Sequence, residues 1–294
     1  MDTLKDSLLQ FAAGGCAGLV EVCIMHPLDL VKTRFQIQRG PDDPQRYKSL
    51  ADCFVRIYRT EGFLSFYKGI LPPILAETPK RAIKFLFFQR YKELFSSPDI
   101  PLPLTFSMAG LCSGLTEGAA ITPFEAVKVR LQAERAVTLA QQKSTFQVAR
   151  EIIATGGYGT NGILKGLDAT LGRHGVWNMV YFGLYHSVRQ NYPAPKDPTA
   201  NFFYRWTVGT VAGTLASILN IPFDVAKSRI QGPQPVKGVI KYSSCFQSIG
   251  LIYKEEGFFA LYKGLVPKIM RLGPSGGIMI VVYESVYEFL KQYF

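Results

Sequence analysis

The sequence has few cysteines, histidines and tryptophans, and it lacks the groupings of residues that make a reactive site. Its five cysteines are odd in number and scattered, with no Cys-x-x-Cys pair and no histidine at metal-ligand spacing. We therefore expect reduced thiols that bind no metal. No nucleophile with a neighbouring base and no phosphate-cradling loop is evident, and the pair Gly156 and Gly157 is too weak a signal for a nucleotide site. From these absences we expect that the protein is not an enzyme and that it binds no cofactor.

Acidic residues are scarce relative to basic ones. The chain has 33 Lys and Arg against 22 Asp and Glu, a net charge of +11, which favours nucleic acid, anionic lipid or small anionic metabolites as partners. No RNA- or DNA-binding motif is present, and a chain that is 48% hydrophobic and rich in Gly and Phe favours lipid. We therefore expect a membrane and no nucleic acid. The N-terminal segment 1–6 carries two acids, which argues against a cleaved secretory signal or an Arg-rich transit peptide.

One ten-residue stretch occurs three times. Its copies begin at Pro27, Pro123 and Pro222, and each reads Pro-x-acid-x-x-Lys-x-Arg-x-Gln. The prolines lie 96 and then 99 residues apart, so the chain consists of one unit of about a hundred residues used three times. We expect a single structural body, because such units cannot bury their apolar faces alone. The predicted repeats are 1–100, 101–197 and 198–294.

A second, shorter repeat follows the first in two of the three units. The segment 61–69 matches the segment 256–264, and both run from Glu-Gly-Phe to Tyr-Lys-Gly. The middle unit keeps only Lys165 and Gly166, and it has a glycine-rich stretch where the acid should be.

Each unit predicts two long helices with a short amphipathic helix between them. The first long helix carries glycines at four-residue spacing, such as Gly14 and Gly18, which predicts a groove for a closely packed helix. This helix should kink at the motif proline and continue to the motif glutamine. The small-residue helices are expected at 11–25, 106–122 and 206–221, the short helices at 50–60, 145–155 and 242–255, and the second long helices at 72–95, 167–190 and 265–292.

None of these helices has 18 apolar residues without a charge, since Glu21 and Glu117 interrupt two of them. Charges in a membrane span are tolerated where they face protein or a water-filled cavity. The expected fold is therefore an all-α membrane protein with six transmembrane helices in three tandem, pseudo-threefold repeats and three short surface helices on one side. An even number of spans places both termini on the same side.

The tripled motif, followed after about thirty residues by acid-Gly, an aromatic, Lys and Gly, resembles the signature of the mitochondrial carriers over the whole chain. The segments 75–82 and 171–176 are most similar to members of that family that carry 2-oxodicarboxylates. The resemblance implies a multi-pass protein of the mitochondrial inner membrane. The net charge, the turns at Tyr67 and Tyr262 and the helix amino termini that follow them favour anionic phospholipid between the units, which by resemblance would be cardiolipin. The basic loops within each unit favour the matrix side for the short helices, with both termini on the intermembrane-space side. A monomer is expected.

The motif residues predict a gate. In each copy the acid, the lysine and the glutamine lie on one helix face. The resemblance implies a closed ring on the matrix side, with the glutamines bracing it; the pairs are Asp29 with Lys128, Glu125 with Lys227 and Asp224 with Lys32, and the glutamines are Gln36, Gln132 and Gln231. The alternative, local pairs on helix surfaces, would contribute roughly 0.2–0.5 kcal/mol each and would give no reason for a threefold repeat.

A second gate is implied at the opposite end, where the family has an aromatic-acid-x-x-basic pattern. Here only Glu284 is acidic, and its implied partner is Lys92, while the middle unit offers Arg189. We expect one ion pair in place of three, and therefore a weakly locked cytoplasmic gate.

Basic residues in the second long helices predict the substrate site. Few acids lie on these helices at the same depth, Glu77 being the nearest, so an incoming dianion is expected to supply the missing charge. By resemblance the contact residues are Lys80, Lys84, Arg173, His174 and Arg271. Arginine offers a planar fork to one carboxylate and lysine a flexible charge to the other. His174 would donate to the 2-oxo group, or would only pack, and Trp177 and Asn178 would set the chain length. Arg81 would point to a neighbouring helix or to the membrane surface.

The function implied by the resemblance is antiport of 2-oxodicarboxylates, such as 2-oxoadipate and 2-oxoglutarate, by alternating access. Three alternatives stay open: a carrier of another organic anion such as malate or citrate, a membrane scaffold or channel, and a soluble basic enzyme.

Overall fold

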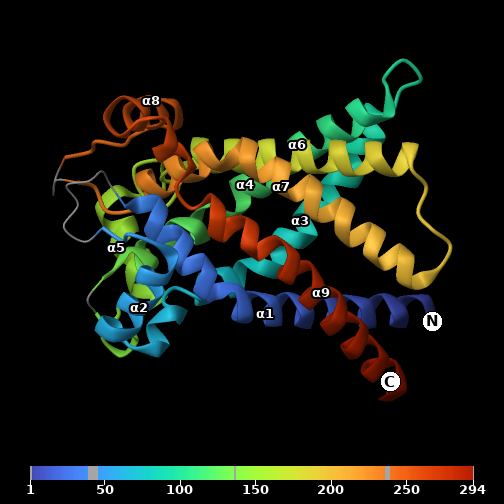
Figure 1. The fold of residues 1–294 in the computed structure, drawn as a ribbon, viewed down its shortest axis with the longest axis horizontal. Coiled ribbons are helices and arrows are strands. Elements are labelled where there is room, and N and C mark those ends of the chain that lie inside the picture. Colours follow the sequence, from blue (N-terminus) through green and yellow to red (C-terminus); the bar gives the residue numbers. More distant parts are fainter. Residues whose placement is uncertain (1, 39–45, 136, 236–238, 294) are drawn as a thin grey trace.

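The computed structural model describes residues 2–38, 46–135, 137–235 and 239–293, and its regular elements are helices (Figure 1). Two long helices and one short helix recur in each third of the chain, as expected. The long helices are α1 (Asp2–Ile37), α3 (Leu71–Phe95), α4 (Leu102–Ala133), α6 (Leu167–Asn191), α7 (Pro198–Gln231) and α9 (Leu265–Tyr293). The short helices are α2 (Leu50–Glu61), α5 (Thr145–Gly156) and α8 (Cys245–Glu256), and the 3-10 turns are η1 (Phe63–Tyr67), η2 (Leu139–Gln141) and η3 (Phe258–Tyr262).

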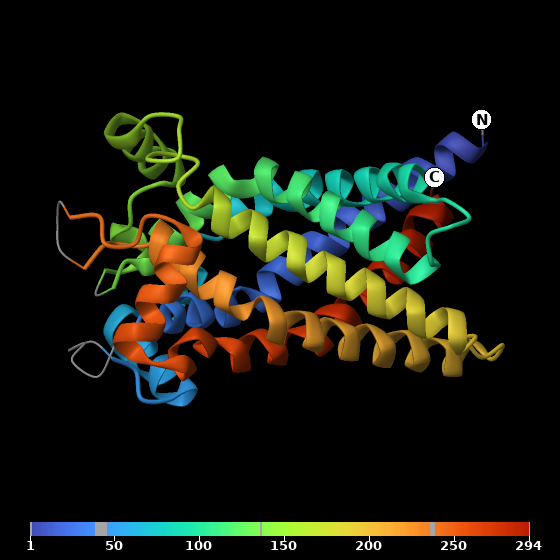
Figure 2. The ribbon, with the colours of Figure 1, turned by 90° about the horizontal axis from the view of Figure 1, so that it is seen from above.

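The long helices form a closed ring. Each packs against the next in the order α1, α3, α4, α6, α7, α9, and α9 packs back against α1 (Figure 2). The three helices that carry the motif, α1, α4 and α7, also contact one another. The motifs therefore converge at one end of the ring.

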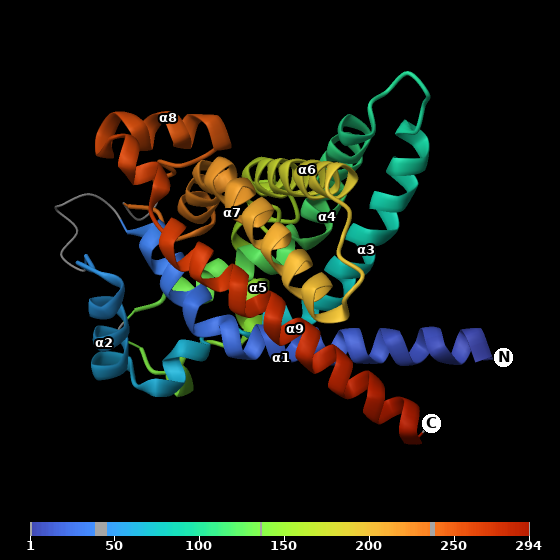
Figure 3. The same ribbon diagram turned by 45° about the vertical axis from the view of Figure 1, so that its right-hand side comes forward.

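Each motif proline lies inside a continuous helix: Pro27 in α1, Pro123 in α4 and Pro222 in α7. The ribbon of α1 changes direction in its second half (Figure 3), as expected of a helix that contains a proline with no amide donor. The bend turns the second half of the helix, with its motif lysine and glutamine, toward the other two motif helices.

The glycine rows allow close packing in the middle repeat. A side chain at Gly110 or Gly114 of α4 would place its Cβ 2.6 Å from the Asn178 carbonyl oxygen of α6 or 2.4 Å from that of His174, so only glycine fits there. Gly14 of α1 has nothing within 4 Å of its Cβ position. The predicted groove is therefore confirmed for α4 and is wrong for Gly14.

Each short helix packs on the second half of its own motif helix. Ile57 of α2 lies in an apolar cluster with Leu30 of α1, and Val148 of α5 lies in one with Leu131 of α4. A third cluster joins α8 to α7. The short helices thus lie at the motif end of the ring, and the N- and C-termini lie at the other end (Figure 1).

Three of the long helices satisfy length and composition criteria for a membrane span: Ala12–Ile37, Pro198–Gln231 and Phe258–Gln292. The others include α3 and α6, which carry several of the predicted substrate cations. Their charges face a polar interior, described below, and a charged span is tolerated in that position.

Candidate functional site

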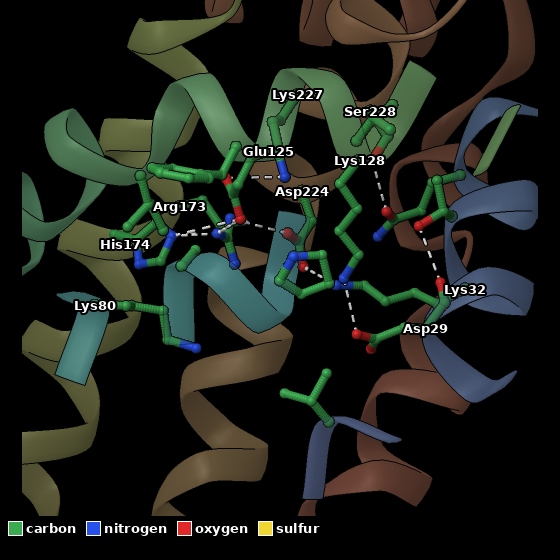
Figure 4. Close-up of a pocket in the computed structure, with 18 of the residues that line it drawn as sticks. Asp29, Lys32, Lys80, Glu125, Lys128, Arg173, His174, Asp224, Lys227 and Ser228 are labelled. Atoms are coloured by element: carbon green, nitrogen blue, oxygen red, sulfur yellow. Dashed lines mark hydrogen bonds and ion pairs between the residues drawn. The ribbon is translucent and has the colours of Figure 1, made fainter. Parts of the chain in front are cut away.

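Three ion pairs close the motif end of the ring, and they join α1, α4 and α7 to one another (Figure 4). They are the pairs implied by the family resemblance: Lys128 with Asp29 at 2.9 Å, Lys227 with Glu125 at 3.0 Å and Lys32 with Asp224 at 3.0 Å. We call these six residues the matrix ring. Asp224 and Lys227 are buried and the other four side chains are largely buried, so the pairs are less screened than surface pairs.

The motif glutamines do not hydrogen-bond to the matrix ring in the described structure, contrary to the expected bracing. Two of them instead accept from a hydroxyl on the neighbouring motif helix: Thr33 donates to Gln132 at 2.7 Å, and Ser228 donates to Gln36 at 2.8 Å. These bonds also tie the motif helices together. The place of Thr33 and Ser228 is taken in α4 by Val129, which has no hydroxyl.

Gln231, the third motif glutamine, is therefore bonded differently. Its amide nitrogen donates to the Lys165 carbonyl at 3.1 Å and lies 3.4 Å from the Thr170 hydroxyl, while its side-chain oxygen has no hydrogen-bond partner in the described residues. The threefold order of these bonds is broken at α7.

A buried cation and carboxylate cluster lies beyond the ring in the first repeat. Glu61 binds both guanidinium nitrogens of Arg34, at 2.6 and 2.7 Å, and accepts from Lys68. Burial alone would raise the pKa of Glu61, but the bonds from Arg34 and Lys68 hold it below its usual value. Burial lowers the pKa of Lys68, against the opposing effect of Glu61.

The third repeat has the same cluster. Arg229 reaches Glu256 at 2.7 and 3.0 Å, and Lys263 reaches Glu256 at 2.6 Å. Arg34 and Arg229 also donate to carbonyls at the end of the neighbouring motif helix, those of Glu134 at 3.0 Å and Gln36 at 2.7 Å. Each cluster therefore joins two repeats.

A cavity of about 140 Å³ lies at the matrix ring, and its lining extends from Gln36 and Ser228 to Val22, which is nearer the N-terminus. Four predicted substrate contacts line it, together with the ring: Lys80, Arg173, His174 and Arg271. The structure therefore brings together residues from α3, α6 and α9 around one cavity. Figure 4 shows three of them, Lys80, Arg173 and His174.

The cations of this cavity already have carboxylate partners, which corrects the expectation that acids at their depth would be few. Arg271 donates to Asp29 at 2.6 Å and to Glu21 at 2.7 Å. Arg173 binds Glu125, and Lys80 binds Glu77 at 2.9 Å. Arg81 binds Glu77 and Glu21, so it points to its own helix and a neighbouring helix.

Sequence reasoning missed three members of this cluster: Glu21, Glu117 and Lys268. The two glutamates were visible only as charges that interrupt a span, although both lie six residues before a motif proline, an offset occupied in the third repeat by Ala216. Lys268 lies one turn before Arg271 on the same helix and binds Asp224 at 2.6 Å. A basic residue in a second long helix was the signal that identified Lys80, and it applies equally to Lys268.

Cations still outnumber carboxylates in this part of the structure, nine to six. The cations are Lys32, Lys80, Arg81, Lys84, Lys128, Arg173, Lys227, Lys268 and Arg271, and the carboxylates are Glu21, Asp29, Glu77, Glu117, Glu125 and Asp224. The excess positive charge favours an anionic ligand.

Lys84 forms no ion pair in the described part of the chain. Its ammonium lies 4.9 Å from the ring centre of Trp177 and 5.7 Å from that of Phe182. These are cation–π contacts, in which aromatic rings take the place of an ion-paired carboxylate beside the charge of Lys84. Trp177 is fixed by its indole nitrogen, which donates to Ser217 at 3.3 Å. Neither Lys84 nor Trp177 is among the residues lining the cavity; both lie outside it.

Glu117 holds His174 and Asn178. The Nδ1 atom of His174 lies 3.1 Å from Glu117, and the Asn178 amide donates to the same carboxylate at 3.0 Å. The other ring nitrogen of His174 contacts the Arg173 guanidinium. In this arrangement the expected donation from His174 to a substrate is not available, because one nitrogen faces Glu117 and the other faces Arg173.

The expected pair at the opposite gate is not formed among the described residues. Glu284 is exposed, Lys92 lies 5.7 Å from the ring centre of Phe106, and Arg189 lies 5.7 Å from that of Tyr185. The structure thus has the matrix ring closed and the Lys92 and Glu284 pair open.

Comparison with known proteins accounts for the threefold arrangement. The family model for mitochondrial carrier proteins matches the chain three times, over residues 5–99, 103–195 and 198–294. The chain belongs to the mitochondrial carrier family. It is 58% identical to the mitochondrial 2-oxodicarboxylate carrier of Rattus norvegicus over 98% of this chain and 97% of the rat protein, and 59% identical to that of Bos taurus over 98% and 96%. It is 41% identical to mitochondrial citrate transporter D of Aspergillus niger, over 96% of this chain and 94% of that protein. This mitochondrial carrier is therefore a transporter by family, built from three carrier units.

Proposed function

We propose that this carrier exchanges 2-oxodicarboxylates, including 2-oxoglutarate, 2-oxoadipate and related C5 to C7 acids, across the mitochondrial inner membrane by alternating access. Support comes from the relatives named for this substrate class at 58 and 59% identity. The mechanism rests on one observation: Arg271 and Arg173 line the cavity and also form ion pairs with two acids of the matrix ring.

A dicarboxylate would act by replacing those acids. Its carboxylates offer Arg271 and Arg173 a bidentate partner, in place of the single hydrogen bond that Asp29 and Glu125 each supply now. A ring acid that loses its arginine keeps only its lysine, so substrate binding weakens the closed ring and shifts the population toward a state open to the matrix. Lys80, which lines the cavity, supplies the charge that a second carboxylate needs. Lys84 lies outside the cavity, so it would contribute only after turning from Trp177 toward the substrate.

In this proposal the matrix ring is the gate on one side, and the group of Lys92, Arg189 and Glu284 is the gate on the other. In the state open to the matrix, Glu284 and Lys92 would form one ion pair where three would be possible, so the second gate is the weaker lock. Both termini face the intermembrane space, and the carrier acts as a monomer with cardiolipin between its units. The three units, 1–100, 101–197 and 198–294, move as parts of one body.

Exchange in liposomes tests the proposal. Vesicles containing the purified carrier and loaded with 2-oxoglutarate should take up labelled 2-oxoadipate, and vesicles without internal substrate should not. Malate and citrate added outside should compete weakly. Equal uptake into empty vesicles would favour a channel, and no uptake under any loading would favour a scaffold.

A citrate carrier is the second candidate, because the Aspergillus niger relative carries that name at 41% identity. The excess of three cations over carboxylates near the cavity is compatible with a trianion. If external citrate inhibited uptake into the liposomes more strongly than external 2-oxoadipate does, the protein would be a citrate carrier.

A further inference from the structure

The middle repeat lacks the carboxylate that the other two repeats bury. Arg130 and Lys165 occupy the motif positions of Arg34 and Lys68, but the position of Glu61 is taken by Gly156. Neither side chain has a hydrogen bond or an ion pair with any residue that the structure describes. Arg34 is 0% exposed, whereas Arg130 is exposed to solvent.

A cavity lies where that carboxylate is missing. Its volume is about 190 Å³, and Arg130, Lys165, Gly156 and Gln231 are among its lining residues. A single water needs about 10–15 Å³ of such volume, so the cavity has room for a ligand of several heavy atoms. It is separate from the central cavity, and the two share no lining residue.

The lining of this cavity is cationic. Glu151 also borders it, but its carboxylate is paired with Lys143 at 2.6 Å. Burial lowers the pKa of Lys165, and the charge of Arg130 lowers it further. No carboxylate in the described residues offsets these effects at Lys165, whereas Glu61 opposes the effect of burial at Lys68.

The chain cannot supply the missing carboxylate from position 156 without moving its backbone. A Cβ at Gly156 would lie 2.2 Å from the Asn161 carbonyl oxygen. The turn that follows α5 is two residues longer than its counterparts in the other repeats, and it folds back over this glycine. Since Glu151 is paired with Lys143 and position 156 has no room for a side chain, the described lining residues do not supply this anion.

We propose that the Arg130 and Lys165 cavity binds an oxyanion, a phosphate or carboxylate group, in the place that buried glutamates occupy in the first and third repeats. Two cations that converge on a cavity can hold such a group through charge-assisted hydrogen bonds. The buried Gln231 oxygen, which has no hydrogen-bond partner among the described residues, is an acceptor for a hydroxyl of the ligand.

Anion binding would also complete the set of arginine hydrogen bonds that connect neighbouring repeats. Arg34 and Arg229, each fixed by its glutamate, donate to carbonyls of the neighbouring motif helix. Arg130 makes no such bond to the described part of α7. A bound anion would orient Arg130 as Glu61 orients Arg34, and would stabilise the state in which the matrix ring is closed. The source of the oxyanion is either a free matrix anion or a lipid headgroup.

Thermal unfolding of the purified full-length carrier in detergent tests the site. Sodium phosphate at about 100 times its dissociation constant, compared with sodium chloride at equal ionic strength, should raise the melting temperature of the wild type by about 5 °C. Arg130→Gln and Lys165→Gln should lose this rise and Lys165→Arg should keep it. Arg150→Gln, which alters an exposed arginine of α5 outside the cavity, should respond as the wild type does.

Cardiolipin in mixed micelles separates the two sources. A rise that requires Lys165 and occurs with cardiolipin but not with phosphate assigns the site to a headgroup, and a rise with phosphate alone assigns it to a free anion. The proposal is overturned if neither probe gives a rise, or if the rise is as large in Arg130→Gln and Lys165→Gln as in the wild type. The readout is stability, so failure of this site leaves the proposed transport activity untouched.

Discussion

Arg271 donates to Asp29 at 2.6 Å, so a residue expected to bind substrate is bonded to an acid of the matrix ring. The other two ring acids are held in the same way, Glu125 by Arg173 and Asp224 by Lys268. Each ring acid thus has one lysine from a neighbouring motif helix and one cation from a second long helix. Substrate binding and ring closure therefore draw on the same cations.

Arg271→Ala should reduce the exchange of labelled 2-oxoglutarate in liposomes about ten- to a hundredfold. The reason is that a hydrogen bond to a charged group contributes about 1.5–3 kcal/mol. Arg271→Lys should recover part of the activity, since lysine keeps the charge but loses the planar fork. Arg205→Ala, on an exposed part of α7, is the matched control and should exchange at the wild-type rate. Wild-type exchange by Arg271→Ala would remove this residue from the site.

The helices and the ring were predictable from the sequence because both follow from a repeated pattern. The tripled motif places the acid and the lysine on one face of three equivalent helices, and the observed ring has the implied pairs. The short helices were predicted to within a few residues, since their amphipathic pattern is local.

The partners of the substrate cations were not predictable in the same way. Glu21 and Glu117 contact side chains on other helices, Arg271 and His174, and such contacts depend on how far each helix is rotated in the bundle. Repeat symmetry does not help, because the third repeat has Ala216 at the matching position. The bonds of the motif glutamines were missed for a related reason: they depend on hydroxyls that only two of the three motifs carry.

Asp224→Asn should destabilise the carrier more than Lys32→Gln does. Asp224 is buried and holds both Lys32 and Lys268, so its neutralisation leaves two cations without a carboxylate. Loss of one partner from a buried ion pair costs about 3–5 kcal/mol. Lys32→Gln leaves Asp224 paired with Lys268 and should cost less. The measurement is the melting temperature of each purified variant in the same detergent, and equal losses would contradict the shared pairing.

Thr33→Val should lower the melting temperature, because the Gln132 oxygen would lose its buried donor, at a cost of about 1–3 kcal/mol. Val129→Thr is the complementary change. It introduces a hydroxyl at the position where α4 lacks one, and the Gln231 oxygen has no hydrogen-bond partner among the described residues. We expect Val129→Thr to raise the melting temperature, or at least to cost less than Thr33→Val. A larger loss for Val129→Thr would show that Gln231 cannot turn to meet the new hydroxyl.

The Arg34 and Glu61 pair should make stability depend on pH in a defined direction. The pKa of Glu61 lies below its usual value of 4.5 in the folded carrier, so the folded state binds fewer protons at Glu61 than the unfolded state does. The stability contributed by Glu61 is therefore fully present above about pH 4.5 and is lost as the pH falls through the lower folded pKa. Glu61→Gln should be less stable than the wild type at pH 7, and the difference should shrink on acidification below about pH 4.5. Melting temperatures of both proteins between pH 3 and 7 provide the measurement, and a difference that grows as the pH falls would contradict the assignment.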